Sequence, residues 1–323
     1  MFSDMREFRL VVLLVFQLIA PALLAQQKLK TENVVIMIMD GPRYSETWGD
    51  STHKLIPHMA NDMAPQGIIS TNFWNNGPTY TCSGHTAICT GVYQKVRNDG
   101  TELPKAPTIF QYWLKESGNK KQRAYIIASK DKLSVLSDCK DRKWRGQYRP
   151  AQDCGENGLN SGYRRDEVTF QRSLQILKEK KPRLTLINFR QPDSWGHAGN
   201  WERFLSSTKK TDEYIYKVFQ YIQTDEFYRG KTTVFVTNDH GRHLDGKKDG
   251  FISHGDKCEG CKHINFFAYG PDFKSNQVID VERELIDIPV TVAAMMGFCI
   301  EKTKGDVMTE LFNRPDLLKG GLE

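Results

Sequence analysis

The chain has 323 residues, of which 39% are hydrophobic and 26% are charged, with a formal net charge of +6. This composition is typical of a globular protein long enough to bury a large core, and it excludes a disordered or collagen-like chain. The Lys and Arg residues are scattered among acids, apart from a small group at residues 142–149, so the charge does not predict binding to a nucleic-acid polymer.

The first 25 residues have the pattern of an export signal. Arg6 and Arg9 precede an apolar run over residues 10–20, and small residues follow as far as Ala25. We expect residues 1–25 to be a signal peptide, the mature protein to be periplasmic or secreted, and no stable membrane span to be left after cleavage. An uncleaved anchor is the alternative.

Apolar runs along the rest of the chain predict buried strands, because they are short and often rich in β-branched residues. They cover residues 34–39, 124–128, 184–189, 233–237 and 265–269. Between and after them, the apolar residues of 107–117, 211–222 and 281–297 recur at helical spacing. Strands that alternate with helices predict an α/β fold with a mostly parallel central sheet and helices on both faces.

We expect residues 28–318 to form a single domain, since the alternation continues along this whole stretch. The polar stretch at about 138–165 contains several glycines and predicts a loop-rich insertion over the edge of the sheet.

Seven cysteines in an exported chain permit disulfides. Cys139 with Cys154, and Cys258 with Cys261, are candidate pairs because they are close in sequence, although sequence does not fix connectivity. Cys258 and Cys261 also match half of a zinc ribbon, but the chain has no second CxxC to complete four thiolates.

Acidic and imidazole side chains follow the predicted strands, where parallel α/β sheets bind their ligands. They are Asp40, Asp193, His197, Asp239 and His240, with His254 in the loop before the last strand. Each alone is also explained as a turn residue, a cap or a surface histidine. Together, three carboxylates and three imidazoles suit zinc and exceed what one catalytic ion needs. Two ions about 4 Å apart could stabilise both oxygens of an in-line displacement.

A candidate nucleophile, Thr81, lies where a small polar loop gives way to a helix-like stretch. A helix start can bind phosphate through free backbone N–H groups, and a coordinated metal ion would activate a threonine hydroxyl. The alternative is that Thr79, Thr81 and Ser83 are turn and N-cap residues. Cys82 is a weaker candidate, because the sequence suggests no His–carboxylate pair beside it.

These motifs, in this order, resemble the alkaline phosphatase superfamily, in particular its type I phosphodiesterase/nucleotide pyrophosphatase branch. The matching segments are Asp40-Gly-Pro-Arg43, Thr81 nine residues before Thr90-Gly91, Asp193-x-x-x-His197, Asp239-His240-Gly241 and His254-Gly255. The resemblance covers nearly all of the mature chain.

The resemblance implies an exported hydrolase of phosphoric esters with two Zn²⁺ ions and a small phosphate-ester substrate. One ion would be held by Asp40, Thr81, Asp239 and His240, and the other by Asp193, His197 and His254. Thr81 would form a phospho-threonine intermediate that water then hydrolyses. His85 and His243 would support the ligands by hydrogen bonds, and Arg43, Arg164 and Arg165 are candidate phosphate contacts, with solvated surface the preferred interpretation for the last two.

Three alternatives stay open at this point. Phosphomonoester hydrolysis uses the same groups and differs in how the pocket treats a second ester group. Sulfate-ester hydrolysis is disfavoured, because sulfatases of the superfamily carry C-x-P-x-R at the nucleophile position whereas this chain has Thr81-Cys-Ser-Gly-His85. A non-catalytic metal-binding protein is the third alternative.

Overall fold

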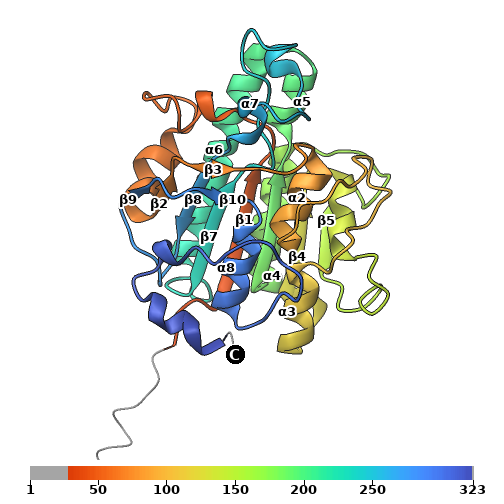
Figure 1. Cartoon of the computed structure of the whole chain (residues 1–323), viewed down its shortest axis with the longest axis vertical. Helices are drawn as coiled ribbons and strands as arrows, with labels where there is room; N and C mark the ends of the chain where they lie inside the picture. The colour runs from red at the N-terminus through yellow and green to blue at the C-terminus, as the bar shows by residue number, and fades with distance from the viewer. Residues whose placement is uncertain (1–27, 322–323) are drawn as a thin grey trace, which may run out of the picture.

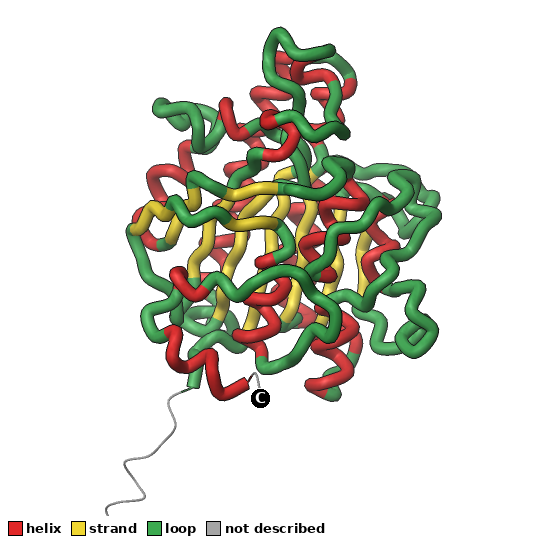
Figure 2. Tube along the Cα trace, in the orientation of Figure 1, coloured by secondary structure: helices red, strands yellow, loops and turns green. Residues whose placement is uncertain are grey.

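The computed structural model describes residues 28–321, so the predicted signal peptide lies outside the described part of the chain. Within that part, no helix combines the length and the apolar character needed to cross a bilayer. Figure 2 shows the strands in the interior of the molecule, with helices in front of them and behind them.

The central sheet has eight strands in the order β5-β4-β6-β1-β7-β8-β2-β9. Their bounds are β1 (Asn33–Met39), β2 (Ile68–Ser70), β4 (Ala124–Ala128), β5 (Ala151–Cys154), β6 (Leu184–Phe189), β7 (Thr232–Thr237), β8 (Phe266–Tyr269) and β9 (Gln277–Ile279). β1 pairs in parallel with β6 and β7, and β8 runs antiparallel to both of its neighbours. The predicted fold, a mostly parallel sheet in an α/β protein, is confirmed.

Helices cover both faces of this sheet, and alternate residues of β1 show the two sides. Val34 and Ile36 lie in one core cluster with residues of α2 (Thr81–Thr90), α3 (Ile109–Ser117) and α8 (Asp287–Met296). Val35 and Met37 lie in the other cluster, with residues of α4 (Asp166–Lys180) and α6 (Trp201–Thr224). Both faces of β1 are therefore buried, as its unbroken apolar sequence predicts.

Two short helices and a small second sheet complete the regular structure. They are α5 (Gln191–His197), α7 (Glu259–Lys262), β3 (Phe73–Trp74) and β10 (Arg283–Glu284). Short segments of 3₁₀- or π-helix are η2 (Tyr44–Glu46), η3 (Met59–Met63), η4 (Ala64–Gln66), η5 (Lys121–Arg123), η6 (Asp131–Ser137), η7 (Gly250–Ile252), η8 (Thr309–Leu311) and η9 (Pro315–Gly321).

Several boundaries differ from the sequence-based expectation. α6 begins ten residues early because the Asn200 side chain caps it, accepting a hydrogen bond from the Arg203 backbone N–H at 3.0 Å. The helix expected over 281–297 begins only at Asp287, since β10 occupies part of that range. The stretch 138–165, expected as a loop-rich insertion, contributes the edge strand β5.

The topology brings the ends of four parallel strands to one edge of the sheet. Asp40 follows β1, Lys130 follows β4, Asp193 lies on α5 after β6, and Asp239 follows β7. Figure 1 shows α5 and α7 together at the top of the molecule, beyond this edge. Side chains distant in sequence therefore meet above the middle of the sheet.

Candidate metal centre

The six predicted metal-binding side chains form two groups. Asp40, Asp239 and His240 make up one group, and Asp193, His197 and His254 make up the other. In each group, the ligand atoms all lie within 4.8 Å of one another. The division into two groups is the one that the family resemblance implies.

The first group is fully buried, and three of its polar atoms, on Asp239 and His240, lack the hydrogen bonds that buried polar atoms need. His240 Nε2 lies 3.4 Å from Asp239 Oδ2 and 3.6 Å from Asp40 Oδ1. Within residues 28–321, neither carboxylate oxygen of Asp239 nor His240 Nε2 has a hydrogen-bond partner. Because His240 Nδ1 donates to the Gly241 carbonyl at 2.9 Å, Nε2 presents a lone pair to the group.

The second group is more open, since the His197 side chain is 48% exposed, and its atoms have hydrogen-bond partners. His197 Nε2 and His254 Nε2 lie 3.3 and 3.4 Å from Asp193 Oδ1 and 3.1 Å from each other. His254 Nδ1 donates to the Thr79 carbonyl at 2.7 Å, which leaves its Nε2 as an acceptor. Asp193 and His197 share one face of α5 because they are four residues apart.

The spacing in both groups fits tetrahedral coordination. Two ligand atoms bound to one zinc ion at about 2.0–2.1 Å are about 3.4 Å apart in a tetrahedron. Acceptor atoms this close repel one another unless a cation or a proton lies between them. The residues present therefore fit two divalent ions, in keeping with the metal-dependent superfamily that the motifs resemble.

Thr81 is the first residue of α2 and is almost fully buried. Its hydroxyl accepts a hydrogen bond from Lys130 Nζ at 3.1 Å. The backbone N–H of Cys82, in the same first turn, donates to Asn98 Oδ1 at 2.9 Å. The helix start thus fixes the hydroxyl next to the two carboxylate–histidine groups.

Lys130 is a site residue that the sequence analysis missed. Its Nζ lies 2.9 Å from Asp40 Oδ1, 2.6 Å from Asp193 Oδ2 and 3.1 Å from Thr81 Oγ1, so it joins the two groups. The side chain is 2% exposed. It follows β4 by two positions, and the rule that identified Asp40, a polar residue after a buried strand, would have found it as well.

The buried charges set one another's protonation. Burial lowers the pKa of Lys130, but the charges of Asp193 and Asp40 outweigh it and raise this pKa, so the ammonium stays charged. Burial, reinforced by the charge of Asp239, raises the pKa of Asp40 to about 6. Burial lowers the pKa of His240 to about 3, so its imidazole is neutral and suited to bind a metal ion.

Polar side chains around the site hold the candidate ligands in place. Asn188 Nδ2 donates to Asp40 Oδ2 at 3.0 Å, and Arg242 Nη1 donates to Asp193 Oδ1 at 2.5 Å. His85, expected to support the ligands, has its Nδ1 3.2 Å from Asp239 Oδ2, but this nitrogen donates its hydrogen bond to the Thr81 carbonyl at 2.9 Å. The bonds from Asn188 and Arg242 orient Asp40 and Asp193 before any ion binds.

Other expected contacts lie elsewhere. Arg43 donates to Glu46 and Asp245, so it is not directed at the site, and the prediction that it contacts phosphate has no support from its position. Arg164 is buried and bonded to Asp153, whereas a solvated side chain was expected. His243 contacts Asp249 and Asp256 and none of the six candidate ligands.

The cysteines do not form the disulfides considered from sequence. Cys139, Cys154, Cys258 and Cys261 are free thiols in the described part of the chain. Cys82 is buried, and burial raises its pKa to about 11. A thiol this weakly acidic is a poor nucleophile.

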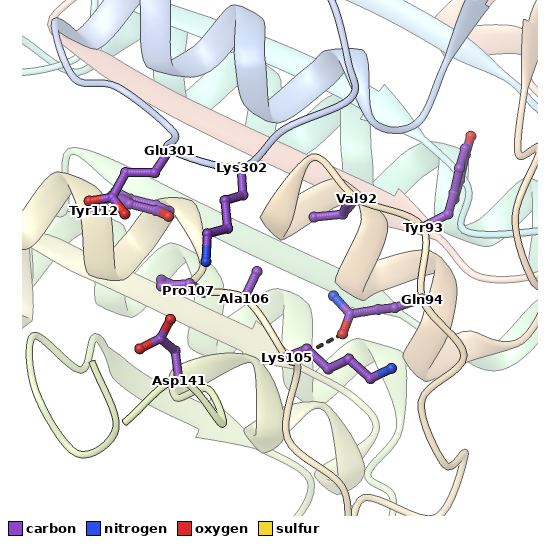
Figure 3. A pocket seen from close by; sticks show the side chains of 10 residues that line it. All are labelled: Val92, Tyr93, Gln94, Lys105, Ala106, Pro107, Tyr112, Asp141, Glu301 and Lys302. Carbon is purple, nitrogen blue, oxygen red and sulfur yellow. Dashed lines mark hydrogen bonds between the residues drawn. The ribbon is translucent and has the colours of Figure 1, made fainter. Parts of the chain in front are cut away.

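A cavity of about 370 Å³ opens elsewhere in the molecule. Figure 3 shows around it Lys105 from the loop before α3, Tyr112 on α3, Asp141 from the loop after η6 and Lys302 from the loop after α8. Its lining includes neither Thr81 nor Lys130 nor any of the six candidate ligands. The chemistry expected from the motifs therefore does not belong to this cavity.

The model of the sulfatase family matches residues 32–298 of the chain. No curated protein sequence matches it.

Solved structures with the same fold are remote in sequence. A protein of the alkaline phosphatase superfamily from Vibrio parahaemolyticus has a TM-score of 0.64 at 17% identity, covering 90% of this chain and 72% of its own. Murine ectonucleotide pyrophosphatase/phosphodiesterase 5 has a TM-score of 0.60 at 14% identity, covering 85% of this chain and 97% of its own. The sulfatase PsFucS1 from Pseudoalteromonas sp. has a TM-score of 0.61 at 14% identity, covering 86% of this chain and 70% of its own.

Proposed function

Since the chain belongs to the sulfatase family of hydrolases, within the alkaline phosphatase superfamily, we propose that it is an exported two-metal hydrolase of phosphoric diesters with Thr81 as its nucleophile. The observation that carries the proposal is the position of the Thr81 hydroxyl. It shares Lys130 Nζ with Asp40 and Asp193, one carboxylate from each of the two ligand groups. A nucleophile placed between two cation sites is the arrangement that in-line displacement at phosphorus requires.

We propose that Asp40, Thr81, Asp239 and His240 hold one zinc ion and that Asp193, His197 and His254 hold the other. When bound, the ions would stabilise the negative charge that develops on the attacking and leaving oxygens. The unpartnered oxygens of Asp239 and the lone pair of His240 Nε2 support the first site. The three nitrogen and oxygen atoms within 3.4 Å of one another support the second.

The reaction has two steps on the protein. The Thr81 oxygen bonds to phosphorus as the ester bond to the leaving alcohol breaks, and water then cleaves the phospho-threonine bond and restores the hydroxyl. Lys130 donates a hydrogen bond to the Thr81 oxygen and remains protonated, so it stabilises negative charge there and does not act as a base. A solved structure of the murine phosphodiesterase relative holds AMP in a threonine-to-alanine variant described as inactive, in keeping with this choice of nucleophile.

Phosphate is favoured over sulfate because of what stands at the nucleophile position. Sulfatases of the superfamily need a cysteine there, and this chain has threonine. Cys82, one position later, is buried and has a raised pKa. We therefore propose that sulfate-ester hydrolysis is a side activity at most.

Lys130 favours a second candidate function, hydrolysis of phosphomonoesters. A monoester carries a dianionic phosphoryl group, and a cation beyond the two metal ions would bind the additional charge. The ammonium of Lys130 provides that cation next to Thr81. The diester and monoester proposals use the same site. They differ in the charge of the phosphoryl group, because Lys130 would stabilise a bound monoester dianion more than a diester monoanion.

The proposed function is tested with purified mature protein, supplied with zinc, on nitrophenyl esters of three kinds: a phosphate monoester, a phosphate diester and a sulfate. We expect Thr81→Ala to lower kcat on the best substrate by on the order of a thousandfold or more, since the nucleophile is lost. Thr90→Ala is the matched control, because Thr90 lies at the other end of α2 and its hydroxyl donates to the Thr86 carbonyl. If Thr81→Ala kept most of the turnover, the assignment of the nucleophile would be wrong.

A further inference from the structure

Four side chains outside the proposed catalytic groups also converge on one point. They are His243, Asp256, Cys258 and Cys261, and their ligand atoms lie within 4.8 Å of one another. The loop after β7 supplies His243, and the segment that leads into and forms α7 supplies the other three. None of the four has a role in the chemistry proposed above.

The imidazole of His243 is aimed into this cluster with its acceptor atom unused. His243 is 3% exposed. Its Nδ1 lies 2.7 Å from Asp249 Oδ1, so this nitrogen carries the proton and donates to the carboxylate. Nε2 then presents a lone pair, and within the described residues it is buried without a hydrogen-bond partner. A carboxylate that orients a histidine in this way is the usual support of a metal-binding imidazole.

The distances inside the cluster fit a small tetrahedral ion. His243 Nε2 lies 3.3 Å from Asp256 Oδ2, close to the value of about 3.4 Å for two ligands of one zinc ion. The other Asp256 oxygen accepts the Cys258 backbone N–H at 2.9 Å, which fixes the carboxylate. Cys258 and Cys261 are free thiols with the C-x-x-C spacing that lets two sulfurs chelate one ion.

We propose that His243, Asp256, Cys258 and Cys261 bind a third zinc ion in a closed, structural site. Two thiolates, one imidazole and one carboxylate complete four-coordinate zinc and leave no open position for substrate. Binding releases the two thiol protons to solvent, and the bound cluster has a net charge of −1. Lys248 Nζ, 2.5 Å from Asp256 Oδ2, balances that charge.

This ion ties together the segments that carry the catalytic ligands. Gly241, next to His240, donates its N–H to the Cys261 carbonyl at 2.9 Å. The Thr79 hydroxyl donates a hydrogen bond to the Asp256 carbonyl at 2.7 Å, and the Thr79 carbonyl accepts one from His254 Nδ1. A zinc ion at the cluster therefore fixes the positions of His240 and His254 without touching the substrate.

The proposal is tested by counting zinc in four proteins: the mature wild type, Cys258→Ser/Cys261→Ser, Asp40→Ala/Asp193→Ala, and Cys299→Ser as the cysteine control. Metal content is measured by mass spectrometry, and each protein is also loaded with cobalt and examined for a thiolate-to-cobalt charge-transfer band. We expect the Cys258/Cys261 variant to lose one zinc ion per chain and the band. We expect the Asp40/Asp193 variant to keep one ion and the band, which separates this site from the catalytic one even if the proposed function fails.

Two results would overturn the proposal. One is that the Asp40→Ala/Asp193→Ala protein folds but retains no zinc and shows no thiolate-to-cobalt charge-transfer band when it is loaded with cobalt. The other is a wild-type protein whose intact mass is lower by two hydrogen atoms because of a Cys258–Cys261 disulfide. Both measurements leave the cluster unmutated, so they hold even if the double cysteine variant does not fold.

Discussion

At the scale of single residues, the ammonium of Lys130 is the positive charge that lies among the buried carboxylates of the site. Three buried carboxylates, Asp40, Asp193 and Asp239, surround its ammonium, and their charges raise its pKa although burial alone would lower it. The lysine bonds to one carboxylate of each ligand group and to the Thr81 hydroxyl. A charged group so placed acts on the phosphoryl oxygens of a substrate as well as on the nucleophile.

We expect Lys130→Met to lower kcat/KM for a phosphomonoester by about tenfold to a hundredfold, and for a diester by much less, because the dianion loses a cation. Steady-state kinetics on both nitrophenyl substrates measures the two ratios. Lys132→Met is the matched control, since Lys132 is also buried but makes none of these three hydrogen bonds. Equal losses on both substrates would contradict a role in recognising the dianion.

At the scale of elements, α2 must approach β7 closely to bring Thr81 to the ligands. The approach is possible because residue 84 is glycine: a Cβ there would overlap the Asp239 carbonyl oxygen. The side chain of Asn75 donates to the same carbonyl at 2.7 Å. The first turn of α2 and the strand end that carries Asp239 and His240 are therefore positioned together.

We expect Gly84→Ala to destabilise the protein by about 1–3 kcal/mol and to weaken zinc binding, because α2 has to move away from Asp239. Denaturant unfolding measures the stability, and calorimetry of the metal-free protein measures the zinc affinity. Unchanged affinity together with lost stability would show that the close approach serves packing alone.

α6 is joined to the segment between β1 and β2 by a buried carboxylate. Asp212 accepts the backbone N–H groups of His58 and Met59 at 2.9 Å each, at the start of η3. Burial raises its pKa from 3.8 to about 6. The carboxyl group of Asp212 thus holds its proton more tightly in the folded state than in the unfolded state. Its contribution to the free energy of unfolding is therefore complete below pH about 4 and declines as the pH rises through 6.

Relative to Asp212→Asn, we expect the wild type to lose about 2 kcal/mol of unfolding free energy between pH 4 and pH 7. Urea unfolding at a series of pH values measures this difference. A difference that is independent of pH, or that shifts in favour of the wild type as the pH rises, would contradict the raised pKa.

Over the whole molecule, the elements with long apolar runs could be predicted from the sequence, whereas the positions of single buried charged side chains could not. The fully buried strands β1, β6 and β7 are continuous apolar runs, and the polar residues that follow them, among them Asp40 and Asp193, could be located from sequence. The short strands β5 and β9 at the two edges of the sheet, and β2 next to β9, have no such pattern, because they depend on tertiary pairing.

The lysine and arginine side chains were the least predictable part of the site. Lys130 is buried against carboxylates 63 and 90 residues away in the sequence, and Arg164 is buried against Asp153, whereas their residue type indicates a solvated surface. The partners of such side chains become visible only when the strand order is known. The roles of Thr81 and the six candidate ligands, the signal peptide and the identity of the metal stay predictions.

The central claim is that two divalent ions occupy the two carboxylate–histidine groups on either side of Lys130. Anomalous diffraction at the zinc absorption edge, from crystals of the mature protein grown with zinc, tests it most directly. We predict one peak among Asp40, Asp239, His240 and Thr81 and another among Asp193, His197 and His254. A single peak, with Lys130 still bridging Asp40 and Asp193, or no peak at either group would contradict the two-metal account.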